Sequence, residues 1–109
     1  MQGGDYATQV KELIDNNKVM MFSKGYCPFC DQAKAALKAV GVNYKVIEMD
    51  EMAGGDQMHQ ALKSIAKMNT VPCTYVGGKK VGGCDDLKAA IRSGSLKTML
   101  NEAGVPNKM

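Results

Sequence analysis

Two cysteines at Cys27 and Cys30, three residues apart, are the pair best suited to chemistry in this sequence. At the start of a helix, this spacing places both sulfurs on the same side of the first turn. The unpaired amides and the positive dipole end of the helix favour a thiolate, the nucleophilic form of cysteine. Pro28 suits the first helical position, where its missing N–H costs nothing. We expect Cys27 to attack and Cys30, shielded inside the helix, to resolve.

The same spacing is also compatible with half of a zinc site or with two cysteines that only fill a core. A zinc site would need two further ligands at suitable spacing. Cys73 and Cys84 are separated by ten residues, and His59 is the single histidine. We therefore expect no metal. A strand before the motif and a helix after it favour the redox interpretation.

Length and composition limit the alternatives. A chain of 109 residues fits one domain, residues 1–109. The net charge of +3 is spread along the chain, and the longest basic run is Lys79-Lys80, so we expect no nucleic-acid partner. Its apolar runs are shorter than the roughly 20 residues that span a bilayer, and its start does not resemble a secretory signal, so we expect no membrane association. The expected location is cytoplasmic, where cysteines are more often catalytic than structural.

Periodicity and turn residues predict short alternating elements. These are a helix from Tyr6 capped by Asp5, a strand at 19–22, a helix at 28–40, a strand at 44–49, a helix capped by Asp56, a strand at 70–76, a return strand at 79–81, and helices at 86–92 and 96–103. A strand–helix–strand order implies a parallel pair, and Gly77-Gly78 implies an antiparallel hairpin. The expected fold is thioredoxin-like α/β, a four-stranded mixed sheet flanked by helices on both faces.

Three segments together resemble the signature blocks of dithiol glutaredoxins. They are Lys24-x-x-Cys27-Pro28-Phe29-Cys30, Thr70-Val71-Pro72 and Gly82-Gly83-Cys84-Asp85-Asp86-Leu87. Each block alone is modest evidence, but their order and separation are specific. The resemblance extends from about Val10 to Leu100 and implies glutathione as co-substrate.

The resemblance also implies how glutathione would bind beside Phe29. In the family, the proline of the block matching Thr70-Val71-Pro72 is cis and lies beside the active-site cysteines. The backbone at the position of Val71 pairs with the cysteinyl part of glutathione, as an added strand would.

The third block and Lys24 would hold the two ends of the same tripeptide. Gly83, Cys84 and Asp85 would lead into a helix whose first amides receive the γ-glutamyl carboxylate. The carboxylate of Asp85 would meet the γ-glutamyl ammonium. Lys24 would supply positive charge near the glycyl carboxylate and also favour the Cys27 thiolate.

The sequence departs from the family pattern at the glycyl end of this site. His59 stands where members commonly carry Gln, with Gln60 about 100° further round the helix, and Asn69 stands where many carry a basic residue. His59 either binds the carboxylate, more strongly when protonated, or is a solvated surface histidine. Cys73 is a further departure, and is either a packing residue or a regulatory thiol.

The reaction that the resemblance implies is thiol–disulfide exchange by a monomer. Cys27 would attack the glutathione sulfur of protein–glutathione mixed disulfides, and a second glutathione would regenerate it; with other disulfides Cys30 could close the Cys27–Cys30 bond. Thioredoxin is the alternative enzyme, but its Trp-Cys-Gly-Pro-Cys motif is absent. An iron–sulfur carrier is the alternative of another class, since some glutaredoxins bridge a [2Fe–2S] cluster between two subunits.

Overall fold

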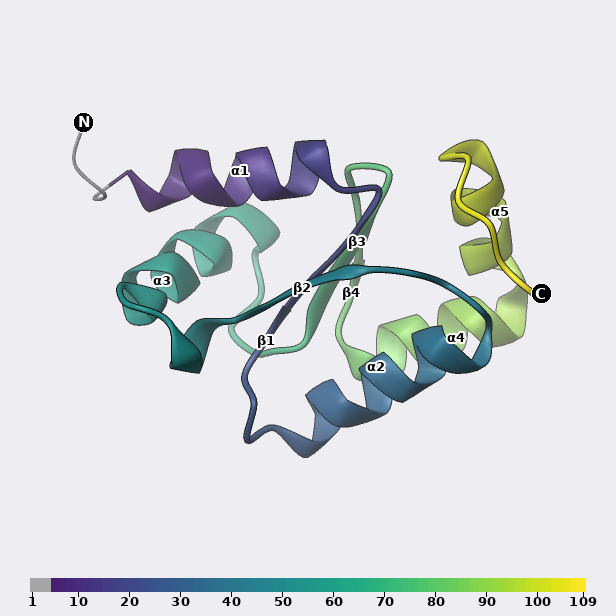
Figure 1. Ribbon diagram of the computed structural model, residues 1–109, viewed down its shortest axis with the longest axis horizontal. Helices are drawn as coiled ribbons and strands as arrows, with labels where there is room; N and C mark the ends of the chain where they lie inside the picture. The colour runs from purple at the N-terminus through teal and green to yellow at the C-terminus, as the bar shows by residue number, and fades with distance from the viewer. Residues whose placement is uncertain (1–4) are drawn as a thin grey trace.

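A computed structural model describes residues 5–109, which form a four-stranded sheet with helices on both faces (Figure 1). The strands are β1 (Val19–Ser23), β2 (Lys45–Glu48), β3 (Cys73–Val76) and β4 (Lys79–Gly82). The helices are α1 (Tyr6–Asn16), α2 (Pro28–Ala39), the 3₁₀ turn η1 (Met49–Glu51), α3 (Gly55–Ala66), α4 (Cys84–Ser93) and α5 (Ser95–Glu102). Within residues 5–109 no helix is long and apolar enough to cross a membrane.

The sheet has the order β2-β1-β3-β4, with β1 parallel to β2 and each other pair antiparallel. Because side chains alternate along a strand, β1 contributes side chains to the cores on both faces of the sheet. Met20 and Phe22 join the core under α1 and α3, whereas Val19 and Met21 join the core under α2, α4 and α5. The predicted mixed sheet, with β1 buried on both sides, is confirmed.

Antiparallel pairing also gathers three distant segments at one edge of the sheet. Phe22 at the end of β1 pairs with Cys73 at the start of β3, and Thr74 pairs with Gly82 at the end of β4. The chain leaving β1, the chain entering β3 and the chain leaving β4 therefore lie next to one another. These are the three segments that carry the sequence motifs.

Asp5 caps α1 as predicted, but the predicted cap at Asp56 is wrong. The Asp5 carboxylate accepts the Thr8 amide at 3.1 Å. Helix α3 instead begins at Gly55, after Gly54 in the left-handed region at φ 78°. A side chain at Gly55 would collide with the Met49 carbonyl, so glycine permits η1 to approach the helix closely. Asp56 then lies in the first turn, where its negative charge suits the helix dipole.

The predicted strand at 70–76 is shorter in the structure and starts at Cys73. Pro72 has no N–H to donate to β1, so ladder pairing begins after it. The strand predicted at 44–49 also ends earlier, at Glu48, and Met49 turns into the core as part of η1.

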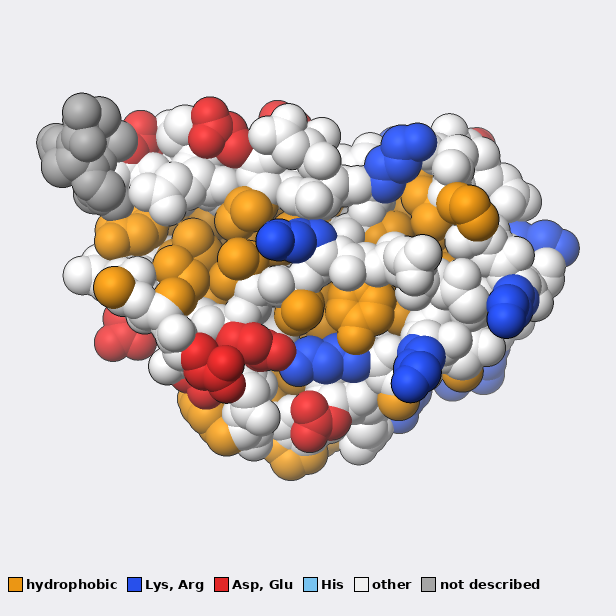
Figure 2. Space-filling view, in the orientation of Figure 1, with side chains coloured by type: hydrophobic (Ala, Val, Ile, Leu, Met, Phe, Trp, Pro, Cys, Tyr) orange, Lys and Arg blue, Asp and Glu red, His pale blue; other side chains and the backbone are white. Residues whose placement is uncertain are grey.

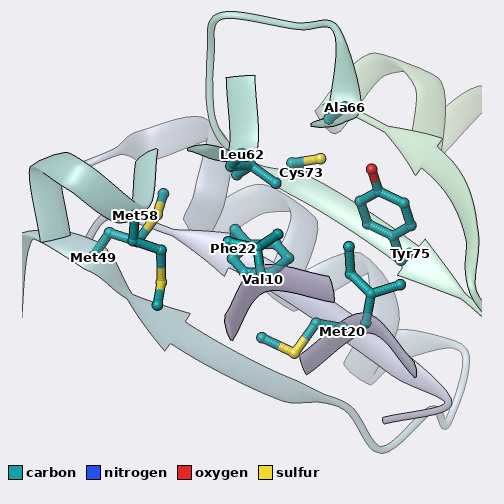
Figure 3. Packing of buried hydrophobic residues seen from close by; sticks show 10 residues of the cluster. Val10, Met20, Phe22, Met49, Met58, Leu62, Ala66, Cys73 and Tyr75 are labelled. Carbon is teal, nitrogen blue, oxygen red and sulfur yellow. The ribbon is translucent and has the colours of Figure 1, made fainter. Parts of the chain in front are cut away.

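Cys73 is a core residue. Its side chain is 0% exposed and lies in the cluster with Phe22 and Leu62 (Figure 3). Burial raises the pKa of the Cys73 thiol to about 12, so the reactive thiolate is scarce at neutral pH. The structure therefore favours packing over a regulatory role for this thiol.

We predict that Cys73 resists modification for as long as the protein stays folded. Native protein treated with oxidised glutathione or iodoacetamide should carry the adduct on Cys27 and not on Cys73, by peptide mass spectrometry. The same reagents applied in denaturing urea should modify Cys73, which serves as the control for its intrinsic reactivity. An adduct on Cys73 under native conditions would contradict the buried position.

Candidate active site

The loop between β1 and α2 is held in a tight turn. The Cys27 amide donates to the Lys24 carbonyl at 3.0 Å. The Gly25 amide donates to Oδ1 of Asp50 on η1 at 2.9 Å, which ties the loop to the neighbouring turn. Cys27 is then the N-cap of α2 and Pro28 its first residue, as the sequence predicts.

The two sulfurs of the motif have different surroundings. The Cys27 sulfur is partly accessible and accepts a hydrogen bond from the Cys30 amide at 3.4 Å. A donor at the end of a helix stabilises negative charge on that sulfur. Cys30 is 0% exposed, and burial raises the pKa of its thiol despite the Ser23 hydroxyl and Lys24 amide nearby. The pair can therefore divide into an attacking and a resolving thiol.

The loop before β3 lies directly against Cys27. The Val71–Pro72 peptide bond is cis, which confirms the prediction. The Val71 carbonyl oxygen lies 3.8 Å from the Cys27 sulfur. A backbone segment is therefore available for pairing at the position where a substrate disulfide would reach the nucleophile.

A pocket of about 480 Å³ opens beside this loop. It is lined by Phe29, Met68, Thr70, Val71, Pro72, Gly83, Cys84, Asp85 and Asp86. Seven of these were predicted as binding residues from the sequence; Met68 and Asp86 were not. Nothing in the sequence around Met68 distinguished it from the core methionines.

Helix α4 presents its N-terminus to this pocket, and it begins at Cys84 rather than at the predicted residue 86. Its N-cap Gly83 has no side chain that could occupy the first-turn amides, so they are free for a ligand. The Asp86 carboxylate accepts the Gly83 amide at 3.0 Å, as the third residue of a capping box does. The Gly–x–x–Asp spacing could have revealed both the helix start and the role of Asp86.

Gly82 and Cys84, the residues on either side of the N-cap, both fit this helix start. Gly82 has φ of +115°, a conformation that side chains rarely adopt, and a side chain there would also collide with the Asp86 carboxylate. The Cys84 sulfur is buried and lies 3.9 Å from Oε1 of Gln32, so it faces the protein. Cys84 therefore offers the pocket its backbone rather than its thiol.

Lys24 and His59 do not line the pocket, but they lie close enough to each other for the charge of Lys24 to act on His59. His59 is only 8% exposed, so the alternative of a solvated surface histidine is wrong. Burial lowers the pKa of His59, and the positive charges of Lys24 and Lys63 lower it further, against the opposing effect of Asp56. Nε2 of His59 is buried with no hydrogen-bond partner. Such an orphaned atom beside two lysines is suited to an anion.

The remaining polar positions near this end are exposed. Asn69 and Gln60 both face solvent, and Gln60 does not share the buried face of α3 with His59. Within the described part of the chain, no group of three or more His, Cys, Asp or Glu side chains could hold a metal ion.

Comparison with known proteins matches this arrangement to one family. The glutaredoxin family model matches residues 19–81. Glutaredoxin-1 of Rhizophagus irregularis is 47% identical over 92 residues, 84% of this chain and 91% of that protein. The glutaredoxin of Ricinus communis is 42% identical over 97 residues, 89% of this chain and 95% of that protein.

Solved structures agree with the sequence relatives. The crystal structure of a buckwheat glutaredoxin–glutathione complex superposes with a TM-score of 0.88 at 35% identity, covering 91% of this chain and 90% of that one. The expected thioredoxin-like fold is thereby confirmed. With its cysteine motif at a helix start, its cis-proline loop and these relatives, the chain belongs to the glutaredoxins, a family of glutathione-dependent thiol–disulfide oxidoreductases.

Proposed function

We propose that this glutaredoxin reduces mixed disulfides between glutathione and proteins, with Cys27 as nucleophile and Cys30 as resolving thiol. The observation that carries the proposal is the position of the Cys27 sulfur. It accepts the Cys30 amide at the start of α2 and lies 3.8 Å from the Val71 carbonyl, at the edge of the pocket beside α4. The Cys27 sulfur thus lies where a bound tripeptide would present its own sulfur.

The reaction proceeds by exchange of one disulfide for another. The Cys27 thiolate attacks the glutathione sulfur of the mixed disulfide, and the protein thiolate leaves and takes up a proton. Cys27 is then joined to glutathione. A second glutathione thiolate attacks the glutathione sulfur of this adduct, which frees Cys27 and forms oxidised glutathione. When the substrate is another disulfide, Cys27 first forms a mixed disulfide with one half of it. Cys30 then attacks the Cys27 sulfur, releases that half as a thiol and closes the Cys27–Cys30 bond, which glutathione later reduces.

Glutathione would lie along the pocket in an extended conformation. The open amides at the start of α4 would receive the γ-glutamyl carboxylate, and Asp85 the adjacent ammonium group. The Val71 backbone would pair with the cysteinyl residue, with Phe29, Thr70 and Pro72 forming the surrounding wall. This orientation directs the cysteinyl sulfur toward Cys27.

The glycyl carboxylate would reach the other side of Cys27. Lys24 supplies positive charge there, and the orphaned Nε2 of His59 supplies a hydrogen-bond partner. His59 thus replaces the glutamine that other members carry. A carboxylate beside the imidazole favours its protonated form, so ligand binding and proton uptake are coupled.

We also propose that the protein is a monomer that acts in the cytosol and does not associate with a membrane. The four cysteines are free thiols, as a reducing compartment would keep them.

We predict that Cys27→Ser and Cys30→Ser separate the two roles. Turnover of a glutathione mixed disulfide, coupled to glutathione reductase, should fall to the uncatalysed rate in Cys27→Ser, because a serine hydroxyl is not ionised at neutral pH. Cys30→Ser should keep turnover of the same order as wild type, since glutathione resolves the Cys27 adduct, and it serves as the matched control. Residual catalysis by Cys27→Ser would reject Cys27 as the nucleophile.

We further predict that glutathione binding strengthens as pH falls. Burial and the neighbouring lysines lower the pKa of His59 in the free protein, and a bound carboxylate would raise it, so affinity should rise as pH drops through the interval between the free and bound pKa values. Between about pH 7.5 and 5.5, S-methylglutathione should bind about 5-fold more tightly, or about 1 kcal/mol, by titration calorimetry. This analogue has no thiol to titrate.

His59→Gln is the control for this pH dependence. It keeps a hydrogen-bond donor but cannot be protonated, so its affinity should be the same across the interval. In wild type, the resonances of His59, the chain's single histidine, should show a pKa that rises on ligand addition. Equal pH dependence in both proteins would exclude a role for His59 in binding.

A further inference from the structure

Two exposed aromatic rings flank Cys27, and one of them, Phe29, also lines the pocket. Among residues 5–109, the large apolar side chains that remain exposed are Tyr26, at 71%, and Phe29, at 57%. They flank the nucleophile in the sequence and belong to the same loop and helix start. Apolar side chains gathered at one place on a surface that is otherwise polar indicate a site of protein contact.

Three exposed carboxylates outside the pocket lie on the elements that adjoin this loop. They are Asp31 on α2 and Asp50 and Glu51 on η1. We refer to these carboxylates, together with Tyr26, as the acidic rim. The amide of Gly25 donates to Asp50, and a side chain at Gly25 would collide with the Glu51 carboxylate, so η1 lies directly against the active-site loop.

The third carboxylate of the rim lies on the helix that begins here. Asp31 lies in the first turn of α2. The ion pair of this region joins Lys34 to Glu48 and involves no rim residue.

The charge of the rim opposes the charge of the molecule. The net charge of the chain is +3. Figure 2 shows acidic side chains gathered in its lower part, over η1 and the start of α2, with hydrophobic side chains along the lower edge. Lys and Arg side chains are concentrated in the right half of this view, toward α5 and the C-terminus. The acidic rim therefore gives the surface beside the active-site loop a local negative charge, on a molecule whose net charge is positive.

We propose that the acidic rim binds the protein half of mixed-disulfide substrates whose modified cysteine is flanked by basic and apolar residues. The inference rests on the proposed function: with glutathione along the pocket, the protein half of the disulfide leaves Cys27 on the side of Tyr26, which does not line the pocket. Apolar residues of the substrate pack on the Tyr26 ring. Lysine or arginine residues beside them meet the carboxylates, which steer association and select partners by charge.

Glutathionylated peptides that differ only in their flanking residues test the acidic rim. One peptide carries Lys and Leu beside the modified cysteine, and a second carries Glu and Leu at the same positions. At low ionic strength, about 0.01 M, kcat/KM should be about 10-fold higher for the basic peptide, and the ratio should fall toward unity in about 0.5 M salt because salt screens exposed charges.

Variants assign this preference to named side chains. The double variant Asp50→Asn, Glu51→Gln should lose most of the preference, since the amide oxygen of the new asparagine can still accept the Gly25 amide and the loop keeps its anchor. The variant Glu12→Gln, Asp15→Asn removes the same charge from α1 and should retain the preference. Tyr26→Ser should lower kcat/KM for both peptides.

A small substrate separates failure of this inference from failure of the proposed function. The mixed disulfide of glutathione with 2-mercaptoethanol has no protein half, so all of these variants should reduce it at the wild-type rate. Normal reduction of this compound together with equal kcat/KM for the two peptides would overturn the acidic rim alone. A preference for the basic peptide that survives in the Asp50→Asn, Glu51→Gln variant would also overturn the acidic rim. If wild type does not reduce the small compound, the proposed function falls and the inference falls with it.

Discussion

The hydrogen bond from the Cys30 amide to the Cys27 sulfur is the interaction on which the chemistry of this molecule depends. It requires that Cys27 be the N-cap of α2, so that a sulfur occupies the position where a serine or aspartate oxygen usually accepts. Pro28 at the first helical position contributes by lacking an N–H that would compete for a partner. The turn that positions this cap follows β1, and β1 is held in place because its side chains pack into the cores on both faces of the sheet.

The strand order supplies the rest of the site. Because β3 is antiparallel to β1 and β4 is antiparallel to β3, the end of β1, the start of β3 and the end of β4 share one edge of the sheet. That edge brings Val71 within 3.8 Å of Cys27 although 44 residues separate them in the sequence. It also directs the open first-turn amides of α4 at the same pocket. A nucleophile, a pairing backbone and an anion site thus converge without any long loop.

The sequence predicted the site where a motif or the family resemblance applied, and failed where packing decides. The Cys27 cap follows from the spacing of the cysteine motif, whereas the cis Val71–Pro72 bond and most of the pocket wall follow from the resemblance to glutaredoxins; the structure has all of them. Two helix starts were misplaced because glycines rather than polar side chains serve as the caps of α3 and α4. The burial of His59 and of Cys73 depends on which face of α3 and β3 meets the core. That face is set by tertiary contacts that no window of a few residues contains.

The distribution of charge shows why net charge is a poor guide to what this site binds. A net charge of +3 suggests a mild attraction for anions over the whole surface. Charges more than about 10 Å apart are largely screened at physiological ionic strength, so a substrate responds to the groups beside Cys27. Among these groups, Lys24 and His59 are suited to a carboxylate, whereas the acidic rim is suited to basic side chains. A mixed disulfide is itself asymmetric, with an anionic tripeptide on one sulfur and a protein on the other. A site that divides its charges in the same way can hold both halves in a single orientation, with the glutathione sulfur toward Cys27.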